Sequence, residues 1–175
     1  MIISDLPLAG LLLLESEPFR DDRGQFSRLF CRNELSERGV GMNIAQINHS
    51  LTRKVGSIRG MHFQRPPHAE IKIIRCLRGK CFDVAVDLRP ESDTYLKWHG
   101  EILEGHDNKA LLIPEGFAHG FQVLEADTEL LYLHSEFYTP EVEAGVRFDD
   151  PQLAIEWPLP PSEISDRDAT LPFIK

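Results

Sequence analysis

The sequence predicts a mainly β protein, built as a closed barrel or a jelly roll. Many short segments alternate apolar and polar residues with a period of two, which is typical of strands. Turn residues separate most of these segments, and helical patterns are few and short. Barrels and jelly rolls of this kind leave an interior that can hold a small ligand. We therefore expect the functional site inside the barrel.

The clearest predicted strand spans residues 81–88. Its residues alternate between two faces, one with Phe82, Val84, Val86 and Leu88 and the other with Cys81, Asp83, Ala85 and Asp87. Similar strand-like segments are expected at 8–14, 25–30, 44–50, 55–63, 71–77, 98–103, 109–113, 116–123 and 129–136.

Two short helices are expected outside the barrel. Residues 33–39 favour a peripheral helix, with Asn33 as a candidate N-cap and Gly39 as its C-terminal stop. Three prolines just after Trp157 exclude regular helix or central strand there. Residues 162–168 then favour a second short helix.

The length of 175 residues is enough for one domain with a sizeable core, so we expect a single domain over residues 1–175. No apolar run approaches the roughly 20 residues that span a bilayer. The N-terminus lacks the features of a secretory signal, which favours a cytoplasmic protein. A net charge of −9 opposes nonspecific binding to nucleic acid or anionic lipid. Local arginines such as Arg23 and Arg59 are still suited to a diphosphate.

The residue pattern argues against a metal and gives no sign of another cofactor. Three cysteines without CxxC spacing indicate neither a disulfide framework nor a thiolate zinc site. The segment from Pro114 to His119 resembles the second motif of metal-binding cupins. Gln64, however, stands where such a protein has the partner histidine of His62. His62 and His119 alone leave too few ligands, so we expect no metal.

Without a metal, the polar residues on the predicted strands favour acid and base catalysis. His62, within Arg59-Gly60-Met61-His62-Phe63-Gln64, is the natural general base because it titrates nearest neutral pH. The Lys72 ammonium is costly to bury and suits a developing oxyanion. Tyr132 is a candidate for the opposing acid. Together these groups predict removal of a proton beside a carbonyl and its return to the other face, which is epimerisation.

Seven motifs, in this order, make the chain resemble the dTDP-4-dehydrorhamnose 3,5-epimerase family of cupin-fold enzymes from about Phe19 to the C-terminus. The motifs are residues 19–26 (FRDDRGQF), 46–50 (QINHS), 59–64 (RGMHFQ), 82–89 (FDVAVDLR), 114–121 (PEGFAHGF), 138–141 (YTPE) and 149–151 (DDP). Any one of them is weak alone, whereas the ordered set is specific.

The resemblance implies a role for each catalytic candidate. His62 is the base, paired with Asp168; Tyr132 is the acid on the other face, and Lys72 steadies the enolate oxygen. It also places a set of residues around the nucleotide sugar, with Tyr138 stacked on the base; this set comprises Arg23, Phe26, Gln46, Asn48, Arg59, His119, Tyr138, Glu143 and Arg167.

The family also implies a homodimer in which an N-terminal strand joins the partner's sheet. The apolar run from Leu11 to Leu14 suits that strand, although the same leucines fit an ordinary core strand. One residue departs from the family pattern: Arg28 stands where an acid is usual, beside the nucleotide, which leaves the nucleotide's identity open.

The expected activity is therefore epimerisation of a dTDP-linked 4-keto-6-deoxy sugar at C3 and C5. Inversion at only one of these centres, on a related nucleotide sugar, is the main competing interpretation, because the sequence does not fix how the ring turns between His62 and Tyr132. Two rival classes are a metal-dependent cupin and a non-catalytic sugar-binding cupin. Stoichiometric metal would favour the former, and a dispensable His62 the latter.

Overall fold

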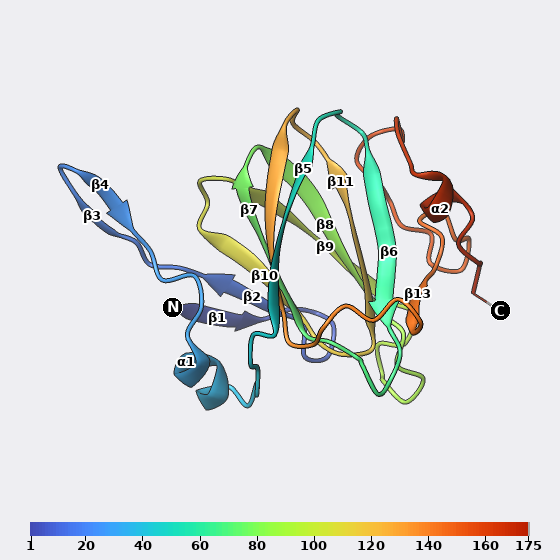
Figure 1. Ribbon diagram of the computed structural model, residues 1–175, viewed down its shortest axis with the longest axis horizontal. Coiled ribbons are helices and arrows are strands. Elements are labelled where there is room, and N and C mark those ends of the chain that lie inside the picture. Colours follow the sequence, from blue (N-terminus) through green and yellow to red (C-terminus); the bar gives the residue numbers. More distant parts are fainter. Residues whose placement is uncertain (175) are drawn as a thin grey trace.

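The computed structural model describes residues 1–174, and these form two large sheets, a separate hairpin and two short helices (Figure 1). The elements are β1 (Ile2–Asp5), β2 (Leu12–Glu15), β3 (Phe19–Asp21), β4 (Gly24–Phe26), α1 (Arg32–Glu37), β5 (Gln46–Thr52), β6 (Ile58–Gln64), β7 (Lys72–Arg78), β8 (Lys80–Asp87), β9 (Trp98–Glu104), β10 (Lys109–Ile113), β11 (Phe117–Val123), β12 (Thr128–His134), β13 (Glu143–Gly145) and α2 (Asp166–Ala169).

Both large sheets are antiparallel and mix strands from distant parts of the chain. One sheet has six strands in the order β1-β2-β10-β7-β12-β5, and the other has five in the order β13-β6-β11-β8-β9. Their inner faces share one apolar core, to which Ile74 and Leu130 contribute from the first sheet and Ala85 and Phe121 from the second. The predicted mainly β jelly roll is confirmed.

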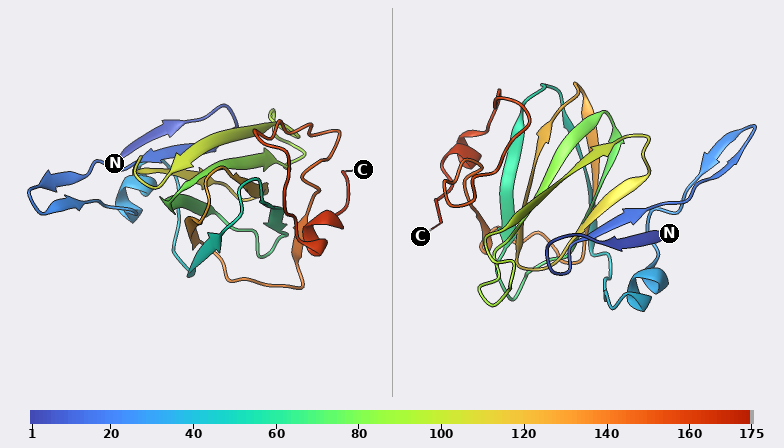
Figure 2. Two further views of the ribbon diagram at one scale, coloured as in Figure 1. Left: turned by 90° about the horizontal axis from the view of Figure 1, so that it is seen from above. Right: turned by 180° about the vertical axis from the view of Figure 1, so that it is seen from behind.

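Each sheet also has a covered outer face, which explains why several strands are buried on both sides. Leu35 of α1 packs against Leu14 and Leu112 on the six-stranded sheet. The C-terminal segment lies along the five-stranded sheet (Figure 2), where Leu153 packs with Val84. The alternation predicted for residues 81–88 is therefore confirmed, with one face in the barrel and the other under this segment.

The β3–β4 hairpin projects away from both sheets (Figure 1). Its strands pair Phe19 with Phe26, and these rings are 69% and 77% exposed. Two exposed apolar rings paired on one hairpin form a patch of the kind that marks an interaction surface.

Some element boundaries differ from the sequence-based expectations. The first helix has Cys31, not Asn33, at its N-cap, and no side chain caps it. The second begins after Ser165, whose hydroxyl accepts a hydrogen bond from the Asp168 amide, so the start at residue 162 is wrong. Gly39 follows α1 with φ +78°, as expected of a stop.

The expected N-terminal strands are shorter than the sequence pattern indicates. Residues 8–11 form a turn with Gly10 at φ +87°, so the strand expected at 8–14 starts only at Leu12. The strand expected at 25–30 ends at Phe26. The short strands β1, β3 and β13 are too brief for a periodic signal.

Candidate active site

A cavity of about 520 Å³ opens between the two sheets and continues into a second space of about 270 Å³. Ser50, His62, His119 and Tyr132 line both spaces. They come from β5, β6, β11 and β12, so both sheets contribute to one polar cavity. Apolar core residues fill the rest of the barrel interior.

His62 and Asp168 form a dyad at the wall of this cavity, with Asp168 buried and His62 half-buried. His62 Nε2 lies 2.7 Å from Asp168 Oδ1, and the Gly60 amide donates to Asp168 Oδ2 at 3.0 Å. Burial raises the pKa of Asp168, but the hydrogen bonds from His62 and Gly60 outweigh it and lower the pKa below its usual value. The carboxylate therefore accepts the Nε2 proton, which leaves the Nδ1 lone pair of neutral His62 free to take a proton.

Gly60 is required by the close approach of β6 to β11. A Cβ at this position would lie 2.5 Å from the Gly120 Cα, and the φ of +122° disfavours other residues. The same residue supplies the amide that binds Asp168. The Arg59-Gly60 sequence therefore fixes where the carboxylate of the dyad docks.

Tyr132 enters the cavity from β12, in the sheet opposite His62. Its hydroxyl lies 2.9 Å from the Ser50 hydroxyl. Burial raises the pKa of Tyr132 far above its usual value, so the phenol keeps its proton at neutral pH. This arrangement provides a proton donor facing the His62 side of the cavity.

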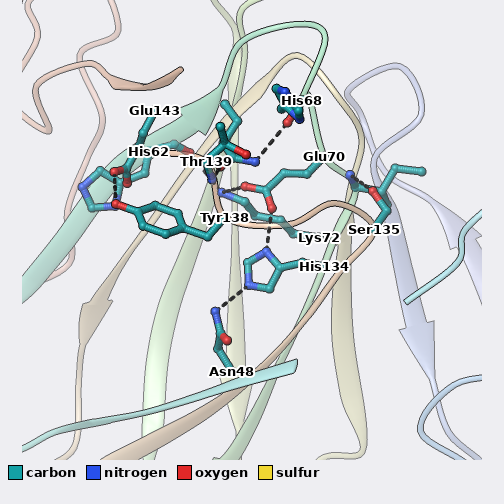
Figure 3. Close-up of polar contacts among 12 residues, drawn as sticks. Asn48, His62, His68, Glu70, Lys72, His134, Ser135, Tyr138, Thr139 and Glu143 are labelled. Carbon is teal, nitrogen blue, oxygen red and sulfur yellow. Dashed lines mark hydrogen bonds and ion pairs between the residues drawn. The ribbon is translucent and has the colours of Figure 1, made fainter. Parts of the chain in front are cut away.

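Lys72 is 8% exposed and lies at the start of β7, beside His62. Its ammonium donates to the His62 carbonyl oxygen at 3.3 Å and pairs with Glu70 Oε1 at 3.1 Å (Figure 3). A cation held at this position is suited to an oxyanion that develops in the cavity.

His119 and Arg59 complete the polar lining. His119 is 6% exposed, and its Nε2 lies 2.9 Å from Asp83 on the neighbouring strand β8. The Arg59 guanidinium donates to the Thr52 hydroxyl at 3.0 Å. Both side chains are thus oriented by partners before any ligand arrives.

Tyr138, Glu143 and Arg167 form a cluster near the cavity mouth. The Tyr138 hydroxyl donates to Glu143 at 2.6 Å, and Arg167 pairs with the other carboxylate oxygen at 2.5 Å. Burial raises the pKa of Glu143, but bonds from Arg167 and Tyr138 lower it overall. The Gln46 amide oxygen accepts from the Tyr138 backbone amide at 2.8 Å, and Gln46 also reaches Asn48 at 3.4 Å. An anionic Glu143 therefore orders both neighbours.

Two expected substrate contacts lie elsewhere. Arg23 and Phe26 belong to the projecting hairpin, where they line a separate groove. Arg28, the residue that departs from the family pattern, pairs with Glu34 of α1.

Gln64 has an evident structural role. Its amide nitrogen donates to the carbonyls of His68 and Phe137, and its oxygen accepts from the Thr139 amide at 2.7 Å. Within residues 1–174, no group of three or more His, Cys, Asp or Glu side chains is arranged to hold a metal ion. Over the same residues, no helix is long and apolar enough to cross a membrane.

Several polar residues of the site were not predicted from the sequence. Ser50 follows Gln46 and Asn48 at even spacing on β5, so alternation already placed it on their face. Asp83 likewise shares the inner face of β8, and His134 lies two residues beyond Tyr132. Glu70, in the loop before β7, gave no periodic signal.

Comparison with known proteins gives one consistent result. The family model for dTDP-4-dehydrorhamnose 3,5-epimerase matches residues 5–175. A Sinorhizobium fredii protein of that name is 38% identical over 175 residues, covering 99% of this chain and 90% of the relative. The Bacillus anthracis dTDP-4-dehydrorhamnose 3,5-epimerase structure, with TDP and pyrophosphate bound, has a TM-score of 0.95 at 38% identity and covers 99% of both chains. A Legionella pneumophila 3,5-epimerase in complex with dTDP-4-keto-L-rhamnose has a TM-score of 0.93 at 36% identity, covering 98% of this chain and 92% of that one.

Proposed function

The chain belongs to the dTDP-4-dehydrorhamnose 3,5-epimerase family, and we propose that it inverts C3 and C5 of a dTDP-linked 4-keto-6-deoxy sugar. The enzyme is an isomerase. The observation that carries the proposal is that two proton-transfer groups, His62 and Tyr132, line one cavity from opposite sheets. Epimerisation requires a base on one face of a carbon and an acid on the other.

The first step is proton removal by His62. The Nδ1 lone pair takes the proton from the carbon beside the ketone, and the C–H electrons move to form an enolate. The imidazolium that results is stabilised by the adjacent Asp168 carboxylate at 2.7 Å. The enolate oxygen carries the displaced charge, and the Lys72 ammonium stabilises it.

The second step is proton return by Tyr132. The phenol O–H bond breaks as the proton goes to the opposite face of the same carbon, which inverts the centre and restores the ketone. Ser50 donates to the phenolate that forms, from 2.9 Å. Solvent then reprotonates Tyr132 and takes the proton from His62. The same sequence at the carbon on the other side of the ketone gives the second inversion.

The nucleotide part of the substrate is assigned to the cluster at the cavity mouth. The exposed Tyr138 ring is suited to stack on the base, and it is oriented by Glu143. Arg59 and Arg167 line the larger cavity and offer guanidinium groups to the diphosphate. His119, Gln46 and Asn48 are assigned to the remaining contacts.

We also propose a homodimer, since Arg23 and Phe26 lie on a hairpin that projects from their own barrel. Such a hairpin places both residues where a partner's cavity can receive them, and the exposed Phe19 and Phe26 rings are then covered. The three free cysteines are in keeping with a cytoplasmic location. The shared barrel core supports one domain over residues 1–175.

The proposed function is tested by incubating the protein with dTDP-4-keto-6-deoxyglucose in deuterated water and following the sugar by NMR. Deuterium at both C3 and C5, with conversion to the rhamnose configuration, is the expected result. Deuterium at C3 alone would show that the enzyme inverts one centre and not two. Absence of label with tight binding of the nucleotide sugar would contradict the enzymatic proposal.

A further inference from the structure

Glu70 is a buried carboxylate that the proposed mechanism does not use. It lies in the loop just before β7, where its two oxygens have different partners (Figure 3). Oε1 pairs with the Lys72 ammonium at 3.1 Å, and Oε2 lies 2.7 Å from His134 Nδ1. The side chain is 9% exposed. Burial raises the pKa of Glu70, but His134 and Lys72 lower it overall, which keeps the carboxylate ionised.

His134 is held in a defined orientation between Glu70 and β5. It is the cross-strand neighbour of Lys72, and its ring stacks on that of Tyr132 with centroids 6.1 Å apart. The Asn48 amide nitrogen lies 3.3 Å from His134 Nε2 and donates to it. A neutral His134 then donates its Nδ1 proton to Glu70. The hydrogen bonds therefore run in one direction, from Asn48 through His134 to the carboxylate.

We propose that Glu70 is a positioning residue that holds the Lys72 ammonium beside His62, with His134 in turn holding Glu70. The inference rests on the proposed role of Lys72 at the enolate oxygen. Lys72 has a long, flexible side chain, and a carbonyl at 3.3 Å is a weak restraint on it. The carboxylate supplies a second, charged restraint.

Other charged groups around Lys72 do not replace Glu70. Within residues 1–174, its ammonium forms one ion pair, with Glu70. The Glu143 carboxylate is occupied by Arg167 and Tyr138. The titratable side chains that share this part of the cavity are His49 from β5, His62 from β6, His119 from β11, Tyr132 and His134 from β12, and Tyr138 and Glu143 from the segment that ends in β13. On the other side, β10 presents Ile113 opposite Lys72.

The test uses Glu70→Gln, which keeps the shape of the side chain and removes its charge. We expect kcat to fall on the order of tenfold or more, with KM changed far less, because the Glu70 carboxylate pairs with Lys72 and His134 and not with the residues assigned to the nucleotide. Glu70→Asp, which keeps the charge, should recover part of the lost kcat.

The matched control is Glu101→Gln. Glu101 also pairs with a histidine and a lysine, His99 at 3.4 Å and Lys109 at 3.7 Å, but on β9 away from the cavity. This variant should retain the wild-type kcat and KM. His134→Gln, which still offers Glu70 a donor, should lower kcat less than Glu70→Gln does.

A wild-type kcat for Glu70→Gln would overturn the inference. So would a lower kcat that follows a lower melting temperature and is not partly restored in Glu70→Asp, since that is the behaviour of a purely structural residue. Lys72→Met distinguishes a failure of the proposed role of Lys72 from a failure of the proposed role of Glu70. If Lys72→Met keeps full activity, the proposed role of Lys72 is wrong and Glu70 has no catalytic group to position. If Lys72→Met loses activity, the Glu70 variants alone decide whether Glu70 positions it.

Discussion

The His62 imidazole and the Asp168 carboxylate lie 2.7 Å apart although 106 residues separate them in the chain. The contact joins β6 in the barrel wall to a four-residue helix near the C-terminus. Both oxygens of the carboxylate are occupied, one by His62 and the other by the Gly60 amide. The C-terminal segment therefore does more than cover the outer face of a sheet, since it supplies the carboxylate partner of His62, the proposed base.

Replacing Asp168 by Asn should reduce kcat/KM by about 100-fold or more, because the amide no longer fixes the His62 tautomer or stabilises the imidazolium. The measurement is the rate of deuterium uptake into the 4-keto sugar. Asp166→Asn, on the same short helix but exposed, is the matched control and should behave as wild type. Equal rates for the two variants would contradict the dyad.

The same carboxylate predicts how stability depends on pH. Hydrogen bonds from His62 and Gly60 hold the pKa of Asp168 below its usual value despite burial, so the folded state binds the proton more weakly than the unfolded state. Its stabilising contribution is present above about pH 4, the unfolded value, and is lost as the pH falls through the folded pKa. Melting temperatures of wild type and Asp168→Asn should therefore differ near neutrality and converge in acid. A difference that grows in acid would be inconsistent with this ion pair.

Tyr132→Phe should separate proton removal from inversion. The variant keeps the ring and loses the proton donor that faces His62, so epimerised product should fall by about 100-fold or more. Deuterium washed into recovered, uninverted substrate should decline much less, because His62 is untouched. Tyr95→Phe, at an exposed position away from the cavity, serves as control. Product formation at the wild-type rate would exclude Tyr132 as the acid.

Much of the barrel could be predicted from the sequence, because alternation is a local signal. On β8 it predicted two faces, and the structure buries both of them for different reasons, one in the core and one under the C-terminal segment. Asp168 could not be identified as a site residue from its neighbours in the sequence, because these are typical of a solvated polar tail. Glu70 also lies outside any periodic pattern, and its partners come from the distant strand β12 and the start of β7.

Helix boundaries were harder to predict than strands. Asn33 and Ser162 are both good capping residues, but the helices begin after Cys31 and Ser165. Ser165 caps α2 at the position that lets Asp168 contact Gly60, so a tertiary contact determines where this helix begins. Capping propensity is a local property and does not predict such a contact.

Replacing Tyr138 should weaken substrate binding and change the rate of the chemical steps little. Tyr138→Leu removes the flat ring and should raise KM on the order of tenfold, in keeping with the worth of one stacked base, while kcat changes less. Tyr138→Phe keeps the ring but loses the hydroxyl bond to Glu143, so its KM should lie between those of wild type and Tyr138→Leu. Titration with dTDP gives the affinity directly. Equal affinities for the Leu variant and wild type would place the base elsewhere.

The projecting hairpin predicts complementation between subunits. In the proposed homodimer, Arg23→Ala and His62→Ala should each damage every site of the dimers that they form alone. When equal amounts of the two variants exchange subunits, about half of the dimers are mixed. One site of each mixed dimer then has Arg23 from the His62→Ala chain and His62 from the Arg23→Ala chain, so about a quarter of all sites should recover. A mixture no more active than its components would show that the hairpin does not serve a partner's cavity.

His62 is the group proposed to take the proton beside the ketone. The most direct test is deuterium uptake at C3 and C5 of dTDP-4-keto-6-deoxyglucose by His62→Ala, measured by NMR beside wild type and an exposed control, His106→Asn. If His62 is the base, wild type and the control label the sugar at equal rates, and His62→Ala labels neither carbon above the uncatalysed rate. Labelling by His62→Ala at the wild-type rate would show that another group removes the proton.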